Sequence, residues 1–472
     1  MTTTVVMNGT VVTQNSEREV IKDGAVAIID ETIADVGPTS EITDAYDPDN
    51  IFDADDGVII PGLINAHTHV SDILLRGAFS TDRGLYDWLF NVKRPGSLAM
   101  TADEHAAAAA LYCAEAIQSG VTTFVENDTE VLWDSCDSIE SKLDVYDQAG
   151  IRNIYAAGFT DRQPSESFEK AIQDIQLRNP DTDSVAPDRL TIDTNTALNE
   201  VESLIEKYHE SADGRQSIWP SPSILVSSST RGLQESYRLA EKYDVMTTTH
   251  VAESEMDARD DGVSSIEYLR NIDYLGNRSL LGHCVQIDSA DVRLLAQTGT
   301  AVAHNYMANM RLATGYAPVV SMLENGVTIG LGTDNSNLSD TINPLSDARA
   351  VAAGHKGYHR EPDVLSAQTL LDIVTIDAAR AISRSDDLGS IEPGKQADVA
   401  VIDFDHPHLT PCPDPVSALV YQVQGFEIDT VLCQGKVIMD NRKLSSFVKP
   451  IGEITSDASE AASRLVERVG IE

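Results

Sequence analysis

Eight apolar, strand-like runs recur along the middle of the chain, and helix-like segments separate them. A strand followed by a helix-length connection predicts a parallel sheet, because parallel neighbours need a long crossover. Eight such units in succession favour a closed (β/α)8 barrel over an open sheet. The eight runs are Val58–His69, Thr122–Asn127, Asn153–Phe159, Ser217–Leu225, Val245–Val251, Leu280–Val285, Thr300–His304 and Thr328–Asp334.

Shorter β patterns occupy both ends of the chain. Ala25–Ile29 near the start and Ala397–Asp403 near the end are apolar or alternating runs with glycine at nearby turns. Strands at both termini around a central α/β region predict one small domain built from both chain ends. The predicted organisation is a composite β-sandwich domain of residues 1–60 and 389–447, a barrel of residues 61–388, and an acidic terminal helix or tail of residues 448–472.

The charge balance excludes some partners. The chain has 34 Lys and Arg against 75 Asp and Glu, a net charge of −41. A field of that sign repels phosphate backbones, so we expect no nucleic-acid partner. Because the acidic residues are spread along the chain, a hydrated surface suited to high intracellular salt, and hence a halophilic protein, is favoured over a dedicated cation-binding surface.

Other bulk features bear on the compartment. No stretch reaches the ~20 apolar residues of a membrane span, and the first residues lack the pattern of a secretory signal. The five cysteines are scattered, without CxxC spacing. We therefore expect a cytoplasmic protein with no membrane partner.

Polar residues suited to metal binding stand at the ends of the predicted strands. His67 and His69 close the first run, His250 the fifth and Asp334 the eighth, while His283 lies near the end of the sixth. Alternate residues of a strand face the same side, so His67 and His69 can point into one cavity. The carboxyl ends of barrel strands share one face, where such folds keep their sites.

Three imidazoles and one carboxylate suit Zn²⁺, with Fe²⁺ as the alternative, and leave a position for water. Each piece alone also fits a structural role: a single histidine is often a satisfied core residue, and Gly332–Asn335 alone is compatible with a turn. Their joint occurrence at the same strand ends favours a site for one divalent ion per subunit.

The chain resembles the amidohydrolase superfamily over almost its whole length. The matching words are Pro61–His69, Thr249–Glu253, Gly282–Val285, Gly330–Asp334 and Leu388–Asp398. The resemblance implies a distorted (β/α)8 TIM barrel, the metal ligands His67, His69, His250 and Asp334, and the catalytic residues Glu253, His283 and Asp334.

Within the superfamily, the chain is similar to the mononuclear branch of aminohydrolases and chlorohydrolases that act on N-heterocycles. Asp87–Leu89 is typical of that branch, and the fourth run, Ser217–Leu225, lacks the lysine that bridges two metals in other members. Two departures from the pattern of nucleoside deaminases weaken the case for a nucleoside substrate. Ser221 stands where nucleoside deaminases carry a histidine, and Ala308-Asn309 replaces a Ser-Asn word.

These observations predict a metal-dependent deaminase. A bound ion lowers the pKa of water from 15.7 toward about 7, and the resulting hydroxide attacks a ring carbon and releases ammonia. Glu253 would donate a proton to a ring nitrogen, and His283 would hold the water and polarise the substrate. A triazine-type chlorohydrolase or alkylaminohydrolase, a nucleoside deaminase of the S-adenosylhomocysteine/methylthioadenosine type, and a non-catalytic scaffold are the alternatives.

Four residues are candidates for substrate binding. Trp88 has the flat ring needed to stack on a heterocycle. Three asparagines near strand ends carry amides that suit the edge of such a ring: Asn127, Asn305 and Asn309. By analogy with the branch, we expect a homo-oligomer, a dimer or higher.

Overall fold

The computed structural model describes the whole chain except residues 79–82, 129–135, 163–190, 340, 448 and 471–472. Each of the eight predicted runs contains a strand, and these strands form two parallel sheets. The first sheet contains β14 (Asp334–Asn335), β6 (Leu63–His69), β7 (Val121–Asp128), β8 (Arg152–Phe159) and β9 (Gln216–Pro222), in that order. The second contains β10 (Thr247–Val251), β11 (Ser279–His283), β12 (Ala301–His304) and β13 (Ile329–Leu331).

The two sheets are linked at both edges. Beyond β9, a bridge between Ile224 and His250 connects the first sheet to β10. Beyond β13, two residues lead directly into β14, which pairs with β6 in parallel. A buried cluster between the sheets collects side chains from both, among them Ala66, Val125 and Ala303. The strand ends therefore surround one interior.

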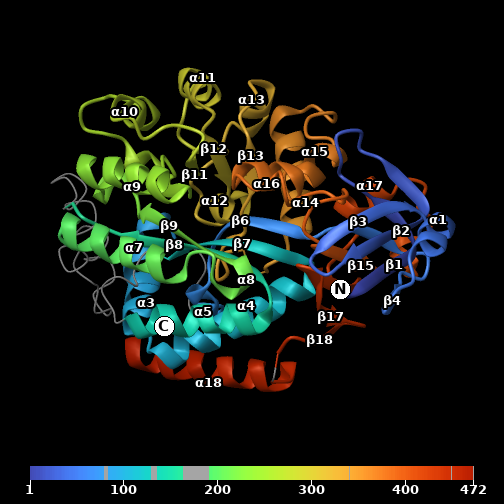
Figure 1. The fold of residues 1–472 in the computed structure, drawn as a ribbon. Helices are drawn as coiled ribbons and strands as arrows, with labels where there is room; N and C mark the ends of the chain where they lie inside the picture. The colour runs from blue at the N-terminus through green and yellow to red at the C-terminus, as the bar shows by residue number, and fades with distance from the viewer. Residues whose placement is uncertain (79–82, 129–135, 163–190, 340, 448, 471–472) are drawn as a thin grey trace.

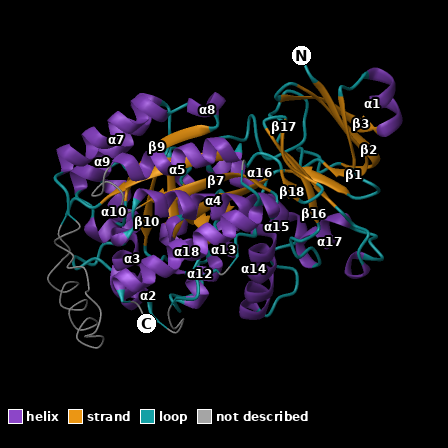
Figure 2. Cartoon of the chain, turned by 90° about the horizontal axis from the view of Figure 1, so that it is seen from below, coloured by secondary structure: helices purple, strands orange, loops and turns teal. Residues whose placement is uncertain are grey.

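Helices cover the outside of these strands (Figures 1 and 2). Helix α4 (Ala102–Gln118) begins with a capping box between Thr101 and Glu104. The other helices that separate the strands are α5 (Cys136–Ala149), α7 (Thr194–Tyr208), α8 (Ser211–Gly214), α9 (Thr230–Tyr243), α10 (Ser265–Asn271), α11 (Ser289–Thr298), α12 (Tyr306–Arg311) and α13 (Val319–Glu324). After β14 come α14 (Pro344–His359), α15 (Ala367–Asp372), α16 (Ile376–Ala381) and α17 (Pro415–Tyr421).

The predicted first run, Val58–His69, is wrong as a single strand. Its first part, β5 (Val58–Pro61), pairs with strands from the two chain ends, and only β6 belongs to the parallel sheet. The break falls at Gly62, where a Cβ atom would lie 2.2 Å from Oγ1 of Thr122. Glycine permits this close approach, so the chain passes from one sheet into the other at this point.

The two chain ends form one nine-stranded sheet, seen at the side of the molecule in Figure 1. The strands β5 and β15 (Val399–Ile402) join its N-terminal and C-terminal parts through antiparallel pairs. Its other strands are β1 (Thr3–Val12), β2 (Val20–Ile29), β3 (Thr32–Pro38), β4 (Asn50–Asp53), β16 (Ile428–Cys433), β17 (Lys436–Asp440) and β18 (Lys443–Leu444). A short helix, α1 (Thr39–Ala45), follows β3. Strands from the two chain ends therefore pair within one sheet.

The predicted terminal helix is present as α18 (Ile451–Val469), while residues 448 and 471–472 of the predicted segment lie outside the described residues. This helix packs along α4 and α3 (Arg94–Ala99). Arg468 near its end contacts the buried carboxylate of Glu104 at 2.8 Å. The C-terminus therefore supports the segment that follows β6. In the described part of the chain, no helix is long and apolar enough to cross a membrane.

Candidate active site

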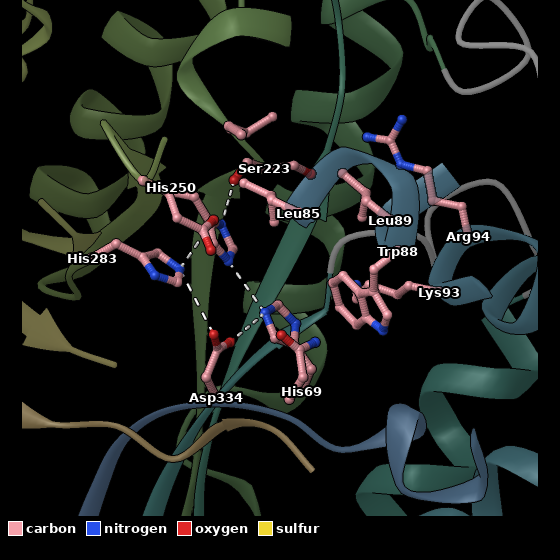
Figure 3. A pocket seen from close by; sticks show the side chains of 13 residues that line it. His69, Leu85, Trp88, Leu89, Lys93, Arg94, Ser223, His250, His283 and Asp334 are labelled. Atoms are coloured by element: carbon pink, nitrogen blue, oxygen red, sulfur yellow. Dashed lines mark hydrogen bonds and ion pairs between the residues drawn. The ribbon is translucent and has the colours of Figure 1, made fainter. Parts of the chain in front are cut away.

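Four side chains from three distant stretches converge at the carboxyl ends of the strands. Asp334 Oδ1 lies 3.3 Å from His67 Nε2 and 3.2 Å from His69 Nε2. His69 Nε2 lies 3.2 Å from His250 Nε2. All four residues are at most 7 % exposed, and Figure 3 shows His69, His250 and Asp334 pointing toward one another. The predicted ligands therefore come together.

These spacings fit one small cation. Two ligand atoms at Zn–N distances of about 2.0–2.1 Å and a tetrahedral angle are separated by about 3.3 Å. The observed separations are 3.2 and 3.3 Å. Nδ1 of His250 lies 2.6 Å from the carbonyl oxygen of Ser223, which can only accept, so Nδ1 carries the proton. The lone pair of Nε2 then faces the centre, as a metal ligand requires.

A bulge in β6 aims the two histidines. Asn65 pairs with Phe124 and Thr68 pairs with Glu126, so β6 has one residue more than β7 over this stretch. Ala66 belongs to the buried interior cluster, and an unbroken strand would turn His67 and His69 to the opposite face. The extra residue restores them to the interior, a known use of bulges beside active sites.

Burial and charge set the protonation of this cluster. Burial lowers the pKa of His250 well below its usual value and also lowers those of His67 and His69. Burial by itself would raise the pKa of Asp334, but the adjacent imidazoles of His67 and His69 hold it well below its usual value. Neutral imidazoles and an ionised carboxylate are the forms that bind a divalent ion.

His283 and Glu253 face this cluster. Nε2 of His283 lies 3.6 Å from Oε2 of Glu253 and 3.9 Å from Oδ2 of Asp334. Burial, and then the charge of Asp334, raise the pKa of Glu253 well above its usual value. A carboxyl group that keeps its proton is suited to act as a general acid.

Backbone strain gathers at the same strand ends. His283 has φ 70° and Asp334 has φ 58°, and the neighbouring Ala252 and Cys284 are also in the left-handed region. Residues other than glycine adopt this region at a cost, and such strained positions cluster at functional sites.

These side chains open into a pocket with an empty volume of about 490 Å³. The helical segment after β6 forms one wall of the pocket: α2 (Leu85–Trp88), a π-helical turn η2 (Leu89–Lys93) and the start of α3. The lining residues are His69, Leu85, Trp88, Leu89, Lys93, Arg94, Ser223, Ile224, His250, Glu253, His283, Asp334 and Asn335.

The four predicted substrate-binding residues lie in different places. Trp88 lines the pocket and is 2 % exposed. Asn127 is buried on the same face of β7 as the interior residue Val125, and its amide has no hydrogen-bond partner among the described residues, but it does not line the pocket.

The other two asparagines contact His283 instead of the pocket. Oδ1 of Asn309 lies 3.0 Å from Nδ1 of His283, and Nδ2 of Asn305 lies 3.3 Å from its Nε2. Because Asn305 donates to Nε2, Nδ1 carries the proton and donates to Asn309. The two asparagines therefore fix the orientation and the tautomer of His283.

Sequence reasoning missed three parts of the site. Two of these parts, Lys93 and Arg94, line the pocket. Their signal in the sequence is a pair of adjacent cations soon after Trp88 in a strongly acidic chain. Asp257, in the short helix η6 (Glu255–Asp257), accepts hydrogen bonds from the backbone amides of Glu253 and Ser254 at 2.8 and 2.9 Å. Nothing in the local pattern singles out Asp257.

The mixed α/β fold carries a buried cluster of histidine and carboxylate donors of the kind that metal-dependent hydrolases use. A family model described as the amidohydrolase family matches residues 58–438, most of the chain. The chain therefore belongs to the amidohydrolase family, and the resemblance seen in its sequence is confirmed.

Individual relatives agree with this assignment. The chain is 30 % identical to an S-triazine hydrolase from Gordonia rubripertincta over 100 % of this chain and 98 % of the relative. It is 34 % identical to a 5-methylthioadenosine/S-adenosylhomocysteine deaminase from Haloarcula marismortui over 90 % of each chain. Its fold is similar to that of an adenosine deaminase from Xanthomonas campestris with bound zinc, with a TM-score of 0.86, 24 % identity and 98 % of each chain covered.

Proposed function

We propose that this chain is a metal-dependent aminohydrolase that uses water to attack a ring carbon of an N-heterocycle and releases ammonia. The observation that carries the proposal is the convergence of three imidazoles and Asp334 at 3.2–3.3 Å, in a pocket that also presents Glu253 and His283. The deaminases and the triazine hydrolase among its relatives act in the same family and support a reaction at carbon–nitrogen bonds.

The proposed architecture is a distorted (β/α)8 barrel of residues 61–388 with a β-sandwich of residues 1–60 and 389–447. Two parallel sheets that are linked at both edges support the barrel. The nine-stranded sheet of both chain ends supports the second domain. In such a barrel, the proposed catalytic groups would lie at the carboxyl ends of the strands, where barrel enzymes keep them.

In the proposed site, His67, His69, His250 and Asp334 hold one divalent ion, and the donor set favours Zn²⁺ over Fe²⁺. Such an ion lowers the pKa of water toward about 7.

The remaining chemistry belongs to this chain's own residues. Asp334 accepts the proton of the attacking water, and His283 orients that water and polarises the target carbon. Glu253 donates a proton to a ring nitrogen, and Glu253 or Asp334 then passes a proton to the amino group, which departs as ammonia. Trp88 stacks on the ring. Positioned proton transfer of this kind contributes about 10²–10⁴-fold to the rate.

The two relatives define the alternatives for the substrate. The triazine hydrolase matches the full chain, which favours release of chloride or an alkylamine from a triazine as the second candidate reaction. Ser221, in place of the histidine of nucleoside deaminases, is buried on β9 with a hydroxyl that has no hydrogen-bond partner among the described residues. The presence of serine at this position weakens the case for a nucleoside substrate. We further propose a cytoplasmic homo-oligomer.

A substrate screen with metal analysis tests the proposal. Purified protein should contain close to one divalent ion per subunit and release ammonia from at least one member of a panel of purines, pterins, pyrimidines and triazines. His250→Ala should lose both the ion and turnover, and Glu253→Gln should keep the ion and lose turnover. The partly exposed His406 and the exposed Glu460 lie outside the pocket and provide matched controls, since His406→Ala and Glu460→Gln should retain both the ion and turnover. Full turnover by metal-free protein would contradict the proposal.

A further inference from the structure

The pocket has two walls of opposite charge. Both of its carboxylates, Glu253 and Asp334, lie with the histidine cluster. Lys93 and Arg94 line the wall on the other side of the pocket, beside Trp88, as Figure 3 shows. Lys93 is 4 % exposed and Arg94 is 9 % exposed. A chain with 34 basic and 75 acidic residues therefore places two of its few cations next to each other in this wall.

A π-helical turn creates this cationic wall. In an α-helix, residues five apart point in different directions, whereas the π turn Leu89–Lys93 joins residues five apart by its hydrogen bonds. The turn therefore brings Lys93 onto the face of Trp88, and Arg94 onto the face of Leu89. All four of these residues line the pocket. π-helical turns are rare in proteins, and those that occur often lie at functional sites.

Trp88 adds a donor to the same wall. Its indole Nε1–H is buried and has no hydrogen-bond partner among the described residues. An indole N–H can only donate, so a ligand that satisfies it must bring an acceptor.

We propose that the wall formed by Trp88, Lys93 and Arg94 binds an anionic oxygen group on the substrate, so that the enzyme acts on N-heterocycles bearing a carboxylate or a phosphate ester. This inference rests on the proposed function, because it names the substrate class of the same pocket. The neutral, reacting edge of the ring faces Glu253 and the metal ligands, and the anionic group lies at the opposite wall. Recognition of the anion fixes which ring carbon meets the attacking water.

Calorimetric binding to the Zn²⁺-loaded protein tests the inference without turnover. Pterin is compared with pterin-6-carboxylate, and adenosine with adenosine 5′-monophosphate. The anionic member of at least one pair should bind about 10- to 100-fold more tightly, the worth of one charge-assisted hydrogen bond or more. The pair that shows the preference distinguishes a carboxylate from a phosphate ester.

Variants locate the preference. Lys93→Met and Arg94→Met should each remove most of it, and Lys93→Gln serves if the methionine variant does not fold. Lys242→Met, which removes an exposed cation on α9, should retain the preference. The inference is overturned if neither anionic compound binds more tightly than its neutral counterpart, or if no compound of either pair binds. It is also overturned if the preference for the anion survives in both Lys93→Met and Arg94→Met. Tight anion-selective binding without ammonia release from any compound would instead count against the proposed function alone.

Discussion

Replacement of Asp257 should impair turnover although this residue touches no proposed metal ligand. Its buried carboxylate accepts hydrogen bonds from the amides of Glu253 and Ser254 at 2.8 and 2.9 Å and from the hydroxyl of Tyr86. Tyr86 belongs to α2 and Glu253 to the segment after β10, so Asp257 ties the general acid to the pocket wall. Asp257 is a positioning residue for Glu253.

The size of the effect follows from these three bonds. Asp257→Ala leaves three donors without this acceptor, and each buried donor left unsatisfied costs about 1–3 kcal/mol. The segment relieves that cost by moving, which displaces Glu253. A displacement of about 1 Å in a catalytic group lowers the rate about 10²-fold. Tyr86→Phe leaves both backbone hydrogen bonds in place, so the expected loss is about tenfold or less.

Steady-state kinetics with metal analysis measures this prediction. Asp257→Ala should lower kcat about 10²-fold, with a smaller change in KM and an unchanged metal content. Asp257→Asn, which keeps one acceptor oxygen, should fall between the alanine variant and the wild type, and it supplies the comparison if the alanine variant unfolds. A kcat within threefold of wild type in Asp257→Ala would refute the positioning role.

Three further outcomes are expected. Asn309→Ala removes the acceptor that holds Nδ1 of His283 and should lower kcat about 10–100-fold at unchanged metal content; an unchanged kcat would remove Asn309 from the site. Lys142 is fully buried between two carboxylates, so Lys142→Met should destabilise the fold by about 3–5 kcal/mol in urea unfolding, and a loss under 1 kcal/mol would contradict this. Burial, and then the charge of His359, lower the pKa of His355 to about 4, so the unfolded chain binds the proton first as the pH falls. Stability should therefore be full above about pH 6.5 and fall by about 3 kcal/mol toward pH 4, and His355→Gln should remove that part of the loss.

The local sequence was sufficient to predict the strands and the candidate ligands. Apolar runs with turn residues between them identify strands, because burial on both faces leaves few polar positions. Histidine and aspartate at the ends of those runs stand out for the same reason, since they interrupt an otherwise apolar pattern. His67, His69, His250 and Asp334 were therefore visible before any contact between them was known.

The pocket wall and the supports of the catalytic groups depend on the tertiary structure. Asn305 and Asn309 follow β12, where the sequence suggested contacts with substrate, yet both contact His283. Lys93 reaches the pocket only because a π turn replaces an α-helical one. These features arise from contacts between residues far apart in the chain, which no local periodicity encodes.

The alternation of side chains along a strand is enough to put His67 and His69 on a common face. Which face they share was decided by one extra residue in β6, between Asn65 and Thr68, relative to its neighbour β7. The register between two strands depends on how both pack, so it exists only in the folded chain. Without that shift, both imidazoles would point away from Asp334.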